Sequence, residues 1–199
     1  NGFVFCCFNN SFKIIPPIFD VWMRVLQNVS GSVMWLLEDN AKAAENLCME
    51  AKQRGINPER LIFAPRMPLS EHLARHHLAD LFIDTFPCNA HTTASDALWA
   101  GLPVVTLTGH SFASRVAASL LNAIDLPELI TTNIQAYEAL LIELGNKPDK
   151  VHEIKQRLQR NRLNTPLFDT PSYCRHLESA YEHMMVQKSN HSPLTPIVV

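Results

Sequence analysis

The sequence predicts an α/β protein built on a doubly wound parallel sheet. Short apolar runs alternate repeatedly with amphipathic stretches, which is typical of parallel strands joined by helices. Right-handed crossovers between such strands place helices on both faces of the sheet. The 199 residues are 47% hydrophobic and 18% charged, which is enough apolar material for a packed core. An open sheet of this kind binds its ligand at the carboxyl ends of its strands.

The expected strands are apolar runs bounded by turn residues or by helical stretches. The first run is rich in aromatic residues and ends at Asn9, and the others are short and mostly aliphatic. They cover residues 3–8, 32–37, 60–64, 81–84 and 104–107, with 126–130 as a short edge strand.

The expected helices follow from apolar periodicity and from residues that start or stop helices. Pro16 opens the first helix, Ser70 is the expected N-cap of the third, and Asn133 with Thr132 caps a later one. Gly55 and Gly145 are expected to end helices. The predicted ranges are 16–27, 41–54, 70–77, 92–100, 111–122, 132–144, 149–161 and 172–186.

We expect one domain over residues 1–188 and a polar, flexible tail over residues 189–199. The chain lacks an initiator Met and opens two residues before an apolar run, which suggests a fragment or a processed product.

Composition argues against several classes of function. The formal charge of −2 does not favour binding to nucleic acid or anionic lipid, and no apolar run is long enough to cross a membrane. Neither of the common glycine-rich nucleotide loops occurs. Five cysteines without a C-x-x-C pair support neither a zinc ribbon nor a thioredoxin motif, and a reducing, cytoplasmic setting is expected. Cys6 and Cys7 are expected to be small buried side chains.

Polar residues gather in the loops after the first and third strands. Asn10 and Lys13 follow the first strand, where Lys13 would neutralise a phosphate, although an ordinary polar turn explains this loop too. His72 and Arg75 lie three residues apart on one helix face after the third strand. They would meet a diphosphate, or Arg75 would instead pair with Glu71.

The loop after the fourth strand carries the strongest signal. His91, Thr92 and Thr93 lead directly into a helix, whose free N–H groups attract anions without a metal or a glycine loop. Asp96, one turn later, would hold His91 or a ligand hydroxyl. An ordinary N-cap explains each residue singly, but not their gathering at the end of a buried strand.

Other residues favour structural roles. Asp84 would accept backbone donors, and the adjacent His76 and His77 are expected at the surface rather than on a metal. The three tryptophans, Trp22, Trp35 and Trp99, are expected in the core.

The chain resembles the C-terminal catalytic region of the O-linked N-acetylglucosamine transferase / SPINDLY family. Its sequence motifs look most like those of the bacterial branch. The matching stretches run in family order over about residues 3–185. They are FNNSFKI, GSVMWLL, RLIFAPRMPLSEHLARHHLADLFIDT, CNAHTTASDALWAGLPVVTL, FASRVAASLL and TPLFDT.

The resemblance implies the Rossmann-like C-terminal half of a GT-B glycosyltransferase, which transfers a sugar from a nucleotide sugar to protein Ser or Thr. UDP-N-acetylglucosamine is the implied donor, and GDP-fucose or UDP-glucose are alternatives used by relatives. A catalytically inert nucleotide-binding module is the competing interpretation. No cofactor or metal is implied. The implied partners are the acceptor protein, an N-terminal Rossmann half and tetratricopeptide repeats.

The resemblance also assigns roles to single residues. Asn10 stands where the family has a longer Gln near the diphosphate, and Lys13 matches the Lys that supports the leaving group. Leu69 stands where animal enzymes carry a Lys beside the base. The remaining implied nucleotide-sugar contacts are Leu37, Met67, His72, Arg75, His91, Thr92, Thr93 and Asp96.

Overall fold

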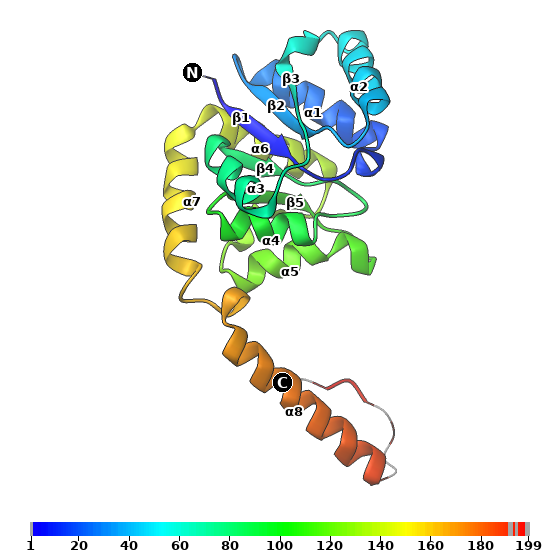
Figure 1. Cartoon of the computed structure of the whole chain (residues 1–199), viewed down its shortest axis with the longest axis vertical. Coiled ribbons are helices and arrows are strands. Elements are labelled where there is room, and N and C mark those ends of the chain that lie inside the picture. The colour runs from blue at the N-terminus through cyan, green and yellow to red at the C-terminus, as the bar shows by residue number, and fades with distance from the viewer. Residues whose placement is uncertain (1, 191–192, 194, 198–199) are drawn as a thin grey trace.

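The computed structural model describes residues 2–190, 193 and 195–197, and its centre is a six-stranded parallel sheet (Figure 1). The strand order is β3-β2-β1-β4-β5-β6. The predicted α/β class and doubly wound, Rossmann-like sheet are confirmed. The strands are β1 (Val4–Cys7), β2 (Val33–Leu37), β3 (Leu61–Ala64), β4 (Leu81–Ile83), β5 (Val104–Leu107) and β6 (Ile130–Thr131).

The helices join and cover these strands. α1 and α6 pack against each other, and α4, α5 and α6 all contact β5. α8 extends away from the sheet at the far end of the molecule (Figure 1). The helices are α1 (Pro16–Asn28), α2 (Ala41–Gln53), α3 (Leu69–Arg75), α4 (Thr92–Trp99), α5 (Val116–Ala123), α6 (Ile134–Asn146), α7 (Pro148–Asn161) and α8 (Thr170–Ser189).

Every residue of β4 and β5 is buried. Because successive side chains of a strand point to opposite faces, the sheet is covered on both sides here. One buried polar chain crosses this core: Trp22 Nε1 donates to the Tyr137 hydroxyl at 3.2 Å, and that hydroxyl donates to the Asp84 carbonyl at 2.7 Å. Cys6 and Cys7 are buried, as expected.

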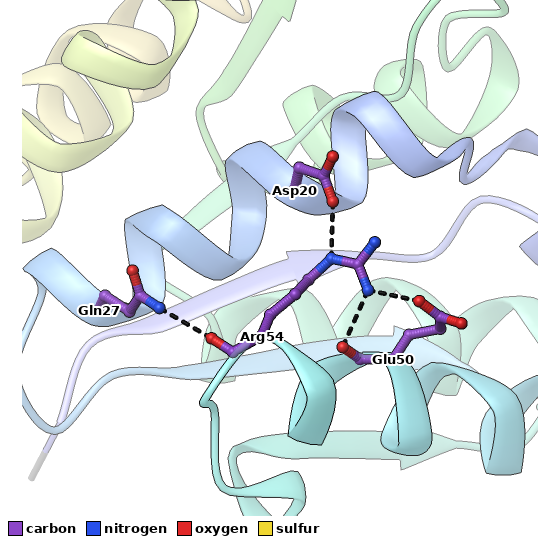
Figure 2. A network of polar contacts seen from close by, with 4 residues as sticks. All are labelled: Asp20, Gln27, Glu50 and Arg54. Atoms are coloured by element: carbon purple, nitrogen blue, oxygen red, sulfur yellow. Dashed lines mark hydrogen bonds and ion pairs between the residues drawn. The ribbon is translucent and has the colours of Figure 1, made fainter.

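An arginine at the end of α2 ties this helix to α1 (Figure 2). The Arg54 guanidinium donates to the Asp20 carboxylate of α1 at 2.6 Å and also pairs with Glu50 of its own helix. Its backbone carbonyl accepts from the Gln27 side chain at 2.9 Å. Helices on the β1–β2–β3 side are thus joined by polar contacts at their solvent edge.

The strand order places a switch point between β1 and β4. The chain moves outward through β2 and β3 and then returns to pair β4 with β1, with Phe5 opposite Leu81. Loops at the carboxyl ends of β1 and β4 therefore diverge, and they leave a crevice that is the usual ligand site of such sheets.

Several expected boundaries differ from the structure. The helix predicted over 111–122 begins only at Val116, because Phe112–Ser114 forms a 3₁₀ turn. α3 begins at Leu69 with Pro68 at the N-cap position, so Ser70 is not the cap. The edge strand predicted over 126–130 is a 3₁₀ turn followed by β6.

Gly145 lies inside α6 and does not end it. A Cβ atom there would come within 2.8 Å of Phe5 and Val29 side-chain atoms, so the glycine permits close packing of the helix on β1. The expected Asn133 cap is present, since its side chain accepts from the Ala136 N–H at 2.8 Å.

Two burial predictions are wrong. His76 is only 1% exposed, because α3 turns into a 3₁₀ segment that points this ring toward Phe8, whereas His77 is exposed. Trp99 is 44% exposed, since it lies at the end of α4 under Arg162 and Phe168 rather than in the core. The predicted tail begins inside α8, and residues 191, 192, 194, 198 and 199 lie outside the described part of the chain.

Candidate functional site

The loop after β1 brings Lys13 to the crevice. The Ser11 N–H donates to the Asp39 carboxylate at 2.9 Å, which holds the loop as a 3₁₀ turn over Ser11–Lys13. From this turn the Lys13 ammonium donates to the Asn89 carbonyl at 2.8 Å. The cation therefore lies against the loop that follows β4, as the shared edge of the two strands predicts.

The start of α4 faces the same crevice. His91 occupies the N-cap position, and no side chain caps the first turn of α4. The Thr92 side chain is exposed, and the Thr93 hydroxyl donates to Asn9 Oδ1 at 2.5 Å. This arrangement leaves helix-start N–H groups and one Lys on one edge, a combination that suits an anion.

A pocket of about 330 Å³ adjoins this edge. Its wall combines apolar and polar side chains, as is common for sites that bind small molecules. It is lined by Phe8, Leu37, Arg66, Met67, Leu69, His72, Arg75, Thr93 and Asp96. Six of the ten residues implied by the resemblance are therefore found around one hollow.

Arg75 is turned inward within this pocket wall. Its guanidinium lies 4.0 Å from the centre of the Phe8 ring, donates to the Pro65 carbonyl at 3.0 Å and contacts His72 Nδ1 at 2.5 Å. The alternative pairing with Glu71 does not occur. Arg75 is 6% exposed, so it supports the His72 ring from behind.

This contact determines which ring nitrogen of His72 carries the proton. A guanidinium only donates, so His72 Nδ1 must accept and the ring proton must sit on Nε2. Nε2 faces Asp96 Oδ2 at 3.8 Å. Burial and then the Arg75 charge lower the pKa of His72, and burial raises the pKa of Asp96. Burial thus outweighs their mutual attraction, and both side chains are held toward neutral forms that suit hydrogen bonds to hydroxyl groups.

Asp96 and His91 do not meet as one interpretation expected. Asp96 faces His72, whereas the His91 ring lies edge-on to Phe112, with centroids 5.9 Å apart, and its Nε2 lies 3.4 Å from the Ala113 carbonyl. His91 is therefore turned toward the 3₁₀ turn that precedes α5, and it does not line the pocket.

Two contacts of the site were not predicted from the sequence. The Arg66 guanidinium donates to Asn10 Oδ1 at 2.7 Å and so links the loops after β3 and β1. Phe8 supplies the ring beneath Arg75. The available signals were weak: an arginine in a loop at the carboxyl edge, and the last aromatic residue of an apolar run.

A larger hollow of about 640 Å³ lies beside the 3₁₀ turn before α5. Phe112 and Arg115 line it, but none of the converging residues above does, so the smaller pocket is the better candidate. Over the described residues, no group of three or more His, Cys, Asp or Glu side chains is placed to hold a metal ion. No helix among them is long and apolar enough to cross a membrane.

Comparisons with known proteins show which chains this one is similar to. The UDP-N-acetylglucosamine--peptide N-acetylglucosaminyltransferase of Caenorhabditis elegans is 36% identical over 197 residues, covering 99% of this chain and 17% of that protein. The Arabidopsis thaliana protein SEC is 37% identical over 183 residues, covering 92% of this chain and 19% of that protein. The chain thus spans less than a fifth of the length of these relatives.

A solved structure matches as well. A variant O-GlcNAc transferase from Thermobaculum terrenum superimposes with a TM-score of 0.87 at 31% identity, covering 92% of this chain and 36% of that one. The family model Glycosyl transferase family 41 matches residues 1–177. Because this model covers most of the chain and the sheet has the same fold as the solved relative, this chain belongs to glycosyl transferase family 41.

Proposed function

We propose that this chain is the nucleotide-sugar-binding part of an inverting glycosyltransferase that moves N-acetylglucosamine from UDP-N-acetylglucosamine to Ser or Thr hydroxyls of a protein. The observation that carries the proposal is the meeting of Lys13 and the α4 start at the switch point, beside a half-apolar pocket. A diphosphate needs the first feature, and a nucleoside needs the second.

In this proposal the nucleoside occupies the pocket. Leu37 and Met67 offer apolar surface to the base, and Asp96 and His72 face a ribose with groups that accept and donate hydrogen bonds. Asn10 accepts a hydrogen bond from Arg66, which lines the pocket, and so lies next to it.

The diphosphate then lies against Lys13 and the first turn of α4. Thr92 and the helix N–H groups bind its oxygens, and Lys13 balances the charge that develops as the sugar–oxygen bond breaks. These donors take the place that a metal ion fills in other glycosyltransferases, so we propose a metal-independent reaction. The hydroxyl of the acceptor protein attacks from the opposite side of the sugar, where another part of the enzyme positions the acceptor and supplies the base, and UDP leaves.

Calorimetry of this chain against UDP, GDP and their sugar conjugates tests the binding part of the proposal. We expect UDP to bind weakly and to keep its affinity in EDTA. Lys13→Ala should weaken binding, whereas Lys147→Ala should not. Lys147 lies between α6 and α7, next to the Asn146 side chain that donates to the Asn28 carbonyl at the end of α1, and it pairs with Glu143 at 3.0 Å. Binding that EDTA abolishes, or no preference for any nucleotide, would contradict the proposal.

The same titrations separate the alternatives. A clear preference for GDP would favour a GDP-fucose donor. An inert binding module predicts nucleotide binding without transfer even when the remaining part of the protein is present. Chain 1–199 by itself should not glycosylate a peptide, since one wall of the proposed site is not part of it.

A further inference from the structure

A buried carboxylate lies next to the proposed phosphate-binding edge, by which we mean Lys13 and the first turn of α4. Asp84 follows β4 and is 1% exposed. Its Oδ1 accepts the Thr85 N–H at 2.8 Å and the Ala90 N–H at 2.6 Å, and its Oδ2 accepts the Thr106 hydroxyl at 2.6 Å. One side chain thus joins the end of β4, the middle of β5 and the residue before the His91 N-cap.

A second set of bonds leads from the same point to the first turn of α4. The Asn9 amide donates to the Thr85 hydroxyl at 2.8 Å and lies 3.5 Å from Asp84 Oδ1. The amide oxygen of Asn9 accepts the Thr93 hydroxyl at 2.5 Å. The Asn89 side chain donates to the Thr85 carbonyl at 2.8 Å, and Lys13 holds the Asn89 carbonyl from outside.

Burying this carboxylate is costly. Desolvation raises the pKa of Asp84 to about 7, although the three hydrogen bonds and the Lys13 charge act in the opposite direction. Apolar side chains would hold this loop against the sheet at a smaller cost in free energy than a buried carboxylate does. The acceptor oxygens of Asp84 are filled by the Thr85, Ala90 and Thr106 donors, and a fully satisfied buried network of this kind favours one geometry of the loop.

We propose that Asp84 is a positioning residue for the phosphate-binding edge, which sets the α4 start at the height and angle that a diphosphate requires. This inference rests on the proposed function. It assigns no ligand contact to Asp84. The carboxylate acts through the Ala90 N–H and, by way of Asn9, through Thr93.

The test uses NMR titration of the whole chain with UDP and with uridine, which lacks phosphate. Asp84→Ala should weaken UDP binding by about 10-fold or more through the misplaced helix start, and uridine binding by less than about 3-fold. Asp84→Asn keeps an acceptor for Ala90 and should restore most of the UDP affinity. If Asp84→Ala does not fold, Thr106→Val takes its place, since it removes only one donor to the carboxylate.

Asp80→Ala is the matched control. Asp80 makes the same kind of contact at the opposite edge of the sheet, where it accepts the Val4 N–H at 2.8 Å and faces Lys155 at 3.6 Å. This variant should leave the ratio of UDP to uridine affinity unchanged. An unchanged ratio in Asp84→Ala, or an equal change in both aspartate variants, would overturn the positioning role.

Amide hydrogen exchange separates this inference from the proposed function. In the ligand-free chain, Asp84→Ala should speed exchange at Ala90 and through the first turn of α4, and Asp80→Ala should not. A wild-type chain that binds no nucleotide would refute the proposed function, whereas unaltered exchange at Ala90 would refute the role of Asp84.

Discussion

Removing the Tyr137 hydroxyl tests how much the buried hydrogen bonds between α1, α6 and the end of β4 contribute to the stability of the fold. Tyr137 is fully buried, and its hydroxyl is the partner of the Trp22 indole N–H and donates to the Asp84 carbonyl. Tyr137→Phe keeps the ring and its packing, so no large cavity forms. The variant isolates the cost of leaving buried polar groups without partners.

The magnitude follows from the two groups affected. The Trp22 N–H loses its partner, which costs about 1–3 kcal/mol, and the Asp84 carbonyl loses one donor at about 1 kcal/mol. We therefore expect the free energy of unfolding to fall by about 2–4 kcal/mol, a large part of the 5–15 kcal/mol typical of a domain.

Urea unfolding followed by circular dichroism and tryptophan fluorescence measures this loss. Tyr173→Phe is the control, because Tyr173 is 64% exposed on α8, and it should change stability by less than about 0.5 kcal/mol. A loss below about 0.5 kcal/mol for Tyr137→Phe as well would refute the reasoning, since it would mean that water or a rearranged neighbour replaces the hydroxyl.

Three further perturbations test other parts of the structure. Gly145→Ala gains about 1 kcal/mol of helix propensity but overpacks the core at a cost of about 1–3 kcal/mol, so urea unfolding should show no stabilisation. Arg75→Gln should raise the pKa of His72, because a nearby positive charge that disfavours the imidazolium is removed; an NMR pH titration of the ring measures it, and an unchanged or lower pKa would contradict the geometry. In the whole enzyme, Lys13→Ala should lower kcat by about 100-fold with a smaller change in donor KM, whereas Thr92→Ala should cost only about 1 kcal/mol. A rise in KM alone would make Lys13 a binding residue only.

The sequence predicted the sheet well because apolar runs and helix periodicity are local signals. The predicted ends of β4 and β5 agree with the structure to within about one residue, since each strand is a run of buried side chains between turn residues. Gly145, His76 and Trp99 were misjudged for the opposite reason. Their environments depend on which distant element packs against them, and no local pattern records that.

The candidate site also has a part that the sequence predicts and a part that it does not. The loops after β1, β3 and β4 were expected to converge, because parallel strands share a carboxyl edge. The inward turn of Arg75 onto Phe8 and the bond from Arg66 to Asn10 depend on side-chain directions across segments far apart in the chain. Residue type and spacing do not determine these directions.

The switch point also makes the proposed anion site depend on the strand pairing that spans the longest stretch of sequence, that of β1 with β4. β1, β2 and β3 pair with their sequence neighbours, whereas the chain must pass β2 and β1 after β3 before β4 can pair with the other side of β1. Lys13 and Asn89 meet only after that return. A chain in which only β1, β2 and β3 were paired would have part of the sheet but no anion site. If the proposed function holds, nucleotide added during refolding therefore has nothing to bind until this central pairing is complete, and it then stabilises the completed state by mass action.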